Sequence, residues 1–273
     1  MASTPSVPEP PESPRLFRPR RVTEILAHAF ALYREHWQNL IATVAIIVIP
    51  LAVLQVLLVD LVIGEAFIET RDGVEVADGS VLAAVLGSIV VAVFSVLMWA
   101  IVTGAITRAS AGTFLGRDLD VRESYRYGLA RLGSIILVGL LAGLAIAGGL
   151  LLLIIPGLFF LTMLTCSLPA LVIEDRRGTA ALGRSWNLVK GFGWHVFATI
   201  VVAGLLTGIA GGILTAPFGD NTFARGIGQA IASTITMPYT ALVGILIYLD
   251  LRVRKERYGP ADLDGDLART AAS

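Results

Sequence analysis

Charged residues are scarce in this sequence. Asp, Glu, Lys and Arg make up 15% of the 273 residues, whereas soluble domains carry about 25%. The 21 basic and 21 acidic side chains balance, so no excess positive charge attracts nucleic acid and we expect no nucleic-acid partner. The single cysteine, Cys166, excludes a disulfide bond within the chain. These shortages argue against an ordinary soluble domain and against a disulfide framework.

Recognisable catalytic and metal-binding motifs are also missing. The chain has no HExxH, GxSxG or P-loop sequence, and no GxGxxG between a strand and a helix. Its few histidines border an amphipathic segment or an apolar run, which favours solvated or interfacial roles over metal binding. They are His28, His36 and His195. Glu174 and Asp175 precede Arg176 and Arg177, a pattern typical of charge pairing. We therefore expect no enzymatic activity, no cofactor and no metal.

Long apolar runs are what the sequence does contain. Hydrophobic residues make up 55% of it, and its mean hydropathy is +0.77. A helix needs about 20 apolar residues to cross a bilayer core, and runs of that length recur along the chain. The sequence thus predicts an all-α, polytopic membrane protein of about six transmembrane helices. The expected spans are residues 40–63, 80–106, 133–155, 157–173, 194–216 and 226–249.

The two ends of the chain differ from this membrane domain, which we place at residues 21–258. Residues 1–20 are rich in proline and serine, and residues 259–273 are small and acidic. Neither segment offers enough apolar surface to offset the entropy of ordering, so we expect both to be disordered. Within the domain, Pro156 and Gly157 interrupt an apolar run that is too long for one crossing, and they predict a tight turn there.

Three polar segments show helical amphipathic spacing: 22–37, 119–131 and 178–190. The first carries its apolar residues on one face and ends in Trp37, a residue enriched at membrane interfaces. We expect all three segments to be interfacial helices. Each precedes a pair of predicted spans, so the pattern is compatible with three copies of one unit, an interfacial helix followed by a hairpin.

The basic residues indicate the orientation of the chain. Of the 21 Lys and Arg, only Arg71 and Arg225 fall on the side that also carries the acidic, turn-rich loop 64–79. Because basic residues concentrate in cytoplasmic segments, we expect the N- and C-termini to be cytoplasmic.

Two predicted spans carry glycines four residues apart. They are Gly139 and Gly143 in the third span, and Gly204, Gly208 and Gly212 in the fifth. Small residues on one helix face let two helix backbones approach closely in lipid. We interpret these glycines as helix-packing residues, either within one chain or between two copies of it.

Three prolines lie inside predicted spans and are expected to kink them: Pro50, Pro169 and Pro238. Hydroxyl side chains accompany two of them, including Thr162 and Thr165 before Pro169, and Thr236 before Pro238. These hydroxyls either line a solute path or bond to the backbone of their own helix. The second interpretation is favoured, because the ionisable residues Asp60 and Asp250 lie at span ends and none lies near a span centre.

One region resembles a known bacterial family. It reads PALVIE over 169–174 and AALGRSWNLVKG over 180–191, and the opening RPRRVTEILAHAFALYREHW adds to the likeness. Together with the six-span layout, these residues resemble the glycerophosphoryl diester phosphodiesterase membrane domain family. The resemblance implies a multi-pass protein of the bacterial inner membrane. Some members carry a fused catalytic barrel, for which this sequence has no residues left, so we expect no phosphodiesterase activity.

The leading functional hypothesis is a non-enzymatic, membrane-organising module that contacts lipids, anionic headgroups in particular, or a protein partner, including a second copy of itself. The motif residues expected to carry the contact or to hold the fold are Glu174, Arg177, Arg184, Ser185 and Lys190. The alternative is a transporter of small molecules or a lipid translocator that uses the proline-kinked spans.

Overall fold

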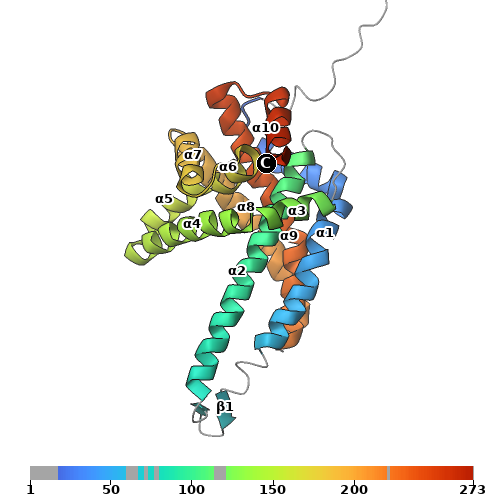
Figure 1. Cartoon of the computed structure of the whole chain (residues 1–273), viewed down its shortest axis with the longest axis vertical. Coiled ribbons are helices and arrows are strands. Elements are labelled where there is room, and N and C mark those ends of the chain that lie inside the picture. The colour runs from blue at the N-terminus through green and yellow to red at the C-terminus, as the bar shows by residue number, and fades with distance from the viewer. Residues whose placement is uncertain are drawn as a thin grey trace, which may run out of the picture.

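The computed structural model of the chain describes residues 18–59, 67–70, 73–76, 80–113, 121–219 and 222–272. Over these residues the protein is helical apart from one short β hairpin (Figure 1). The helices are α1 (Val22–Val59), α2 (Ser80–Thr113), α3 (Val121–Ala130), α4 (Leu132–Leu152), α5 (Ile154–Leu164), α6 (Ser167–Glu174), α7 (Thr179–Val189), α8 (Gly193–Thr215), α9 (Thr222–Glu256) and α10 (Pro260–Ala272), with a 3-10 turn at Ala216–Phe218. The hairpin pairs β1 (Phe67–Thr70) antiparallel to β2 (Gly73–Val76), inside the stretch predicted as a loop.

Five helical stretches in the described part of the chain are long and apolar enough to cross a membrane. They are Ala92–Ala111, Leu132–Leu152, Ile154–Glu174, Gly193–Phe218 and Ala224–Glu256. This finding confirms a polytopic membrane protein, and the five stretches correspond to the second to sixth predicted spans. The first predicted span, 40–63, coincides with the second half of α1 and extends beyond the described residues. The predicted disorder of residues 1–20 falls almost entirely on residues outside the described part.

The first amphipathic segment packs against a candidate span, α9. It forms the first part of α1, and a break at His36, with φ −112° and ψ 18°, separates it from the rest of that helix. Part of its apolar face is buried, with Ile25 fully enclosed, and the Tyr33 hydroxyl donates to the Ile235 carbonyl oxygen of α9 over 3.1 Å. Phe30 and Trp37 on the same face remain exposed, so the interfacial position of 22–37 stays a prediction.

The main apolar core lies where α1 and α9 run side by side. From α9 it receives Leu242, Ile245 and Tyr248, all fully buried, and from α1 it receives Leu40 and other apolar side chains. By contrast, many apolar side chains of α4 and α8 are exposed. In a membrane protein such surfaces face hydrocarbon, so their exposure agrees with the spans assigned to these two helices.

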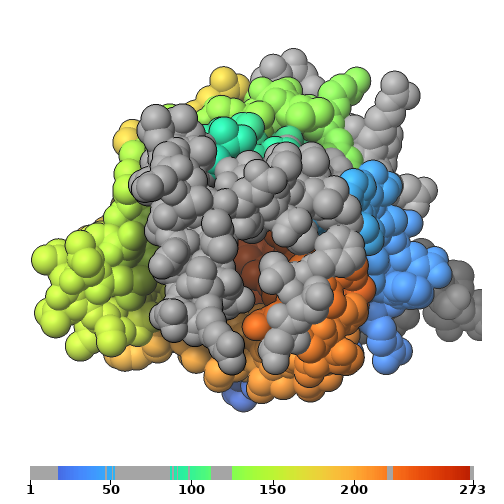
Figure 2. Space-filling model, turned by 90° about the horizontal axis from the view of Figure 1, so that it is seen from below, coloured from blue at the N-terminus to red at the C-terminus, as the bar shows by residue number. Residues whose placement is uncertain are grey.

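The turn between the third and fourth spans occurs three residues before the predicted position. Leu153 is extended, with φ −164° and ψ 152°, and α5 begins at Ile154. Pro156 thus lies in the first turn of α5, where a missing backbone N–H costs nothing. Seen from below, the tip of the α4–α5 hairpin, in yellow-green, projects from the side of the body (Figure 2).

Adjacent glycines near this turn provide a matched test of the hairpin. A Cβ on Gly149 would lie 2.9 Å from the Gly157 Cα atom, whereas a Cβ on Gly148 would meet nothing within 4 Å. We expect Gly149→Ala to force α4 and α5 apart and to lower the free energy of unfolding by about 1–3 kcal/mol. Gly148→Ala should leave it unchanged or raise it slightly through better helix propensity. Thermal unfolding in detergent measures both, and equal stabilities would contradict this close packing.

The glycines expected to pack helices have different surroundings. A Cβ on Gly139 would lie 2.6 Å from the Trp99 ring, so α4 meets α2 at this point. At Gly143, Gly204, Gly208 and Gly212 an added Cβ would meet nothing within 4 Å. The glycine face of α8 is therefore open within the chain, and its packing role stays a prediction.

The prolines expected to kink helices also differ from one another. Pro50 and Pro238 lie inside α1 and α9, and the residue with non-helical angles in α1 is His36, not Pro50. Pro169 lies in the first turn of α6, because the fourth span divides into two helices at 165–166. Thr162, Thr165 and Thr236 each donate to the carbonyl oxygen four residues earlier in the chain. These hydroxyls bond to their own backbone, in agreement with the favoured interpretation.

The C-terminal segment is ordered, contrary to expectation. Residues 260–272 form α10, in which Leu263 and Leu267 are buried. Two leucines spaced four residues apart make a narrow apolar stripe, which is enough to dock a short helix that also finds polar partners. The prediction of a disordered tail from residue 259 is wrong for this reason.

Candidate functional site

The resemblance motif lies at one end of the molecule, which we name the capped end. It consists of α6, α7, α10 and the last turns of α9 (248–256), at the top of Figure 1, opposite the β hairpin. The start of α1 reaches it as well, since the Arg20 backbone N–H donates to an Asp250 carboxylate oxygen over 2.7 Å. Both described ends of the chain therefore meet at the same end of the protein.

A tight turn brings the two halves of the motif together. Asp175, directly after α6, adopts a left-handed conformation with φ 55°, and its N–H donates to the Ala170 carbonyl oxygen. Gly178, directly before α7, also has φ 55°, a conformation that glycine adopts without strain. The chain thus reverses within a few residues, and α7 folds back onto α6.

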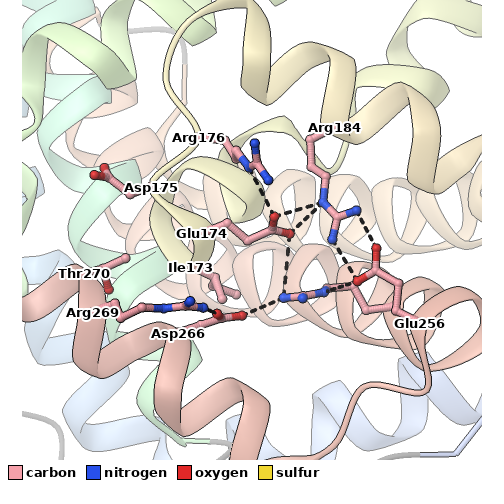
Figure 3. Close-up of a pocket in the computed structure, with 10 residues that line it drawn as sticks. Ile173, Glu174, Asp175, Arg176, Arg184, Glu256, Asp266, Arg269 and Thr270 are labelled. Carbon is pink, nitrogen blue, oxygen red and sulfur yellow. Dashed lines mark hydrogen bonds and ion pairs between the residues drawn. The ribbon is translucent and has the colours of Figure 1, made fainter.

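Glu174 and Arg184 form the centre of an ion-pair network. The Arg184 Nε atom lies 2.8 Å from Glu174 Oε1, and the other end of the same guanidinium donates to Glu256 over 2.8 Å (Figure 3). The Glu174 side chain is only 9% exposed. One arginine of α7 therefore joins the last residue of α6 to the last residue of α9.

Arg252 extends the network to α10. Its guanidinium lies 2.8 Å from Glu256 Oε2 and 2.7 Å from Asp266 Oδ2, and it stacks 3.7 Å from the ring centroid of Tyr258. The Tyr258 hydroxyl donates to Asp266 over 2.8 Å, and the Tyr248 hydroxyl donates to Glu174. The network therefore links α6, α7, α9 and α10 in one set of contacts.

Two groups of this network have pKa values raised above the ordinary range. Burial alone lowers the pKa of Arg184, but hydrogen bonds to Glu256 and Glu174 outweigh it, so the pKa of this guanidinium is raised above its ordinary value. Burial, followed by the hydrogen bond to Asp266, raises the pKa of Tyr258. Arg184 stays charged and Tyr258 stays neutral at physiological pH, so these two groups offer no proton for acid–base chemistry there.

Ser185 has a structural task. It is fully buried, its hydroxyl donates to the Met163 carbonyl oxygen over 2.7 Å, and the Cys166 N–H donates to it over 3.0 Å. These two backbone groups flank the break between α5 and α6, where the regular helical bonds stop. Ser185 of α7 therefore provides hydrogen-bond partners for two backbone groups at the break in the fourth span.

Arg177 and Lys190 are more exposed than Arg184. Arg177 pairs with Asp175 at 3.1 Å, and its side chain remains 56% exposed. Asp175 also lies 3.4 Å from the Arg131 guanidinium. Lys190 directly follows α7 and is exposed, and its side chain has no ion-pair partner among the described residues. The motif thus places one half-buried arginine within the network and two basic residues at the surface.

A polar pocket of about 640 Å³ opens beside the network (Figure 3). Four arginines and four carboxylates line it: Arg176, Arg184, Arg252 and Arg269, with Glu174, Asp175, Glu256 and Asp266. Because the two signs balance and many of these groups bind one another, the pocket has no net charge to select an ion. In the described part of the chain, no group of three or more His, Cys, Asp or Glu side chains is arranged to hold a metal.

A second, apolar pocket of about 730 Å³ lies between α5 and the start of α8. Its walls include Leu158, Phe159 and Met163 from α5, and Trp194 and Phe197 from α8. Trp194 is 84% exposed and stacks edge-to-face on Phe197, with 5.6 Å between the ring centroids. This pocket can accept an apolar chain.

Several residues of the site were not identified from the sequence. The sequence patterns do not single out Tyr248, Arg252 or Glu256. Asp266 and Tyr258 were placed in or beside a tail expected to be disordered. The available signal was the four-residue spacing of Tyr248, Arg252 and Glu256, which puts all three on one face of a helix.

Comparison of the chain with protein families, with curated proteins and with solved structures finds no match. The resemblance to the glycerophosphoryl diester phosphodiesterase membrane domain therefore stays a prediction. What the geometry adds is a contact between its two halves, because Glu174 of the first half binds Arg184 of the second.

Proposed function

We propose that this protein is a non-enzymatic membrane protein whose capped end contacts anionic lipid headgroups. The observation that carries the proposal is a group of exposed basic side chains at the two ends of α7, a helix that the ion-pair network holds in place. Arg176 and Arg177 precede α7 with side chains 57% and 56% exposed, and exposed Lys190 follows it. A basic residue near an anionic membrane surface contributes about 1 kcal/mol of attraction.

The ion-pair network supports this role by holding α7 in place. Arg184 binds Glu174 and Glu256, so it is not free for a headgroup. With α7 fixed, the exposed cations lose less conformational freedom when they meet a lipid. The distribution of basic residues along the sequence makes the cytoplasmic leaflet of a bacterial inner membrane the surface we propose.

The lipid composition around the protein tests this function. The protein is extracted with a styrene–maleic acid copolymer from membranes of known phosphatidylglycerol and phosphatidylethanolamine content, and the co-extracted lipids are quantified. We expect enrichment of phosphatidylglycerol around the wild type, and its loss when Arg176, Arg177 and Lys190 are all changed to glutamine.

A charge-retaining triple variant is the control for this experiment. Arg176→Lys, Arg177→Lys and Lys190→Arg keep the three positive charges and should keep the enrichment. If the glutamine variant stays enriched in phosphatidylglycerol while it still inserts, the headgroup function is wrong. A protein partner retained by the wild type and lost with the glutamine variant would favour the partner-binding form of the hypothesis.

The transporter alternative receives less support from the contacts. The hydroxyls that would line its path, at Thr165 and Thr236, bond to carbonyl oxygens of their own helices. Solute flux into proteoliposomes tests this alternative directly, and sustained uptake of any solute pool would favour it over the headgroup function.

A further inference from the structure

We infer that the apolar pocket between α5 and α8 is a specific lipid site, which holds an acyl chain of an anionic phospholipid with its phosphate beside Lys190. The choice of an anionic headgroup rests on the proposed function, whereas the acyl-chain site rests on the pocket itself.

The walls of the pocket match hydrocarbon. Most of them come from two candidate spans, Ile154–Glu174 and Gly193–Phe218, so we infer that this part of the surface faces the bilayer. Most of the lining side chains are aliphatic or aromatic, and the Thr162 hydroxyl among them already donates to the Leu158 carbonyl oxygen over 2.8 Å. A polar solute would find few partners along these walls, and an acyl chain needs none.

Two lysines supply positive charge at one place on the rim of the pocket. Phe192, which lines the pocket, has the Lys255 Nζ atom 5.8 Å from its ring centroid, whereas the nearby Arg254 is paired with Asp250 at 2.7 Å. The Lys255 ammonium also donates to the Lys190 carbonyl oxygen over 2.7 Å. Lys190 is next to the lining residue Gly191 and is itself exposed. An apolar groove with a cationic rim is complementary to an anionic phospholipid, because the groove can hold the acyl chain and the rim can hold the phosphate.

The two parts of this site contribute differently to binding. An acyl chain that enters the pocket leaves other hydrocarbon, so the transfer from water contributes nothing and the gain is packing against the walls. The cations near Phe192 distinguish anionic from zwitterionic headgroups, because they interact with net charge. The pocket should therefore set how many lipids are held, and Lys190 should set which ones.

One glycine offers a place to fill the pocket, and a second offers a matched control. An added Cβ meets nothing within 4 Å at Gly193, which lines the pocket, or at Gly183, which lies on α7 away from it. Full-length protein in detergent with equal phosphatidylglycerol and phosphatidylcholine is analysed by native mass spectrometry. We expect Gly193→Leu to lose one tightly held lipid and Gly183→Leu to keep it. Lys190→Gln should keep one lipid but lower the preference for phosphatidylglycerol about fivefold.

The outcomes separate this inference from the proposed function. If Gly193→Leu holds as many lipids as Gly183→Leu, the pocket is not a lipid site, whatever the copolymer extraction shows. If Lys190→Gln keeps the full preference for phosphatidylglycerol, the phosphate does not lie beside Lys190. If the lipid is lost from Gly193→Leu while the copolymer extraction shows no enrichment, the pocket stands and the proposed headgroup function fails.

Discussion

Aspartate at Leu263 and Leu267 will detach α10 from the protein. Both leucines are buried, with exposed fractions of 0% and 2%. Truncating a buried leucine costs about 2–5 kcal/mol, and burying an unpaired carboxylate in its place adds a further penalty. A helix of 13 residues is marginal by itself in water, so α10 should unfold when it leaves its site.

Detachment of α10 should also weaken α2 and α4. Buried Arg108, in α2, donates to the Thr270 hydroxyl over 2.8 Å and to the Leu267 carbonyl oxygen over 3.1 Å. Buried Arg131, directly before α4, donates to the Thr270 carbonyl oxygen over 3.2 Å. These acceptors lie near the C-terminus of α10, where the helix dipole also favours cations. Loss of the helix removes these partners from both arginines.

Limited trypsin digestion of membranes measures the detachment, because Arg269 becomes a cleavage site in an unfolded segment. We expect rapid cleavage there in the Leu263→Asp, Leu267→Asp variant, together with a lower thermal unfolding temperature. The control places aspartate at Ala261 and Ala268, which are exposed positions of the same helix, and it should behave as the wild type. Equal protection of the two variants would show that α10 is not docked through its leucines.

Glu174→Gln should produce the second large loss of stability. The Glu174 carboxylate lies 2.8 Å from Arg184 and 3.6 Å from Arg252, and it also accepts a hydrogen bond from Tyr248. Breaking a largely buried ion pair costs about 3–5 kcal/mol, and because Arg184 keeps Glu256 as a partner we expect the lower end of that range. For a chain of this size we expect the unfolding temperature to fall by about 10 °C.

A double-mutant cycle separates a true pair from two independent losses. Arg184→Met combined with Glu174→Gln should cost clearly less than the sum of the single changes, since each single variant already removes the contact between the two residues. Glu35→Gln is the control, because this carboxylate is exposed, and it should stay within about 0.5 kcal/mol of the wild type. Additive losses for Glu174 and Arg184 would contradict a direct pair.

The membrane character of the chain could be predicted from its sequence because hydropathy is a local property. Any uncharged run of about 20 apolar residues must be a helix to satisfy its backbone in lipid, so stretches such as Leu132–Leu152 and Gly193–Phe218 were identified without knowledge of their neighbours. The amphipathic spacing of 178–190 likewise predicted a helix, which is α7.

Local patterns did not reveal where polar side chains find their partners. Arg184 and Glu256 are 72 residues apart, and Arg20 and Asp250 are 230 residues apart, so nothing in either neighbourhood marks the contact. The same limit explains α10: its composition alone predicts disorder, and it folds because α6 and Arg252 provide the surface on which it docks.

By itself, then, the sequence determined that this is a helical, multi-pass membrane protein, since crossing a bilayer requires only apolar length. Only the tertiary structure decided that Glu174, Arg184 and Ser185 hold the fold while Arg177 and Lys190 face outward. The physical reason is that distant helices supply the partners of a charged or hydroxyl side chain. Where such partners are present, the side chain stabilises the fold, and where they are absent it remains at the surface.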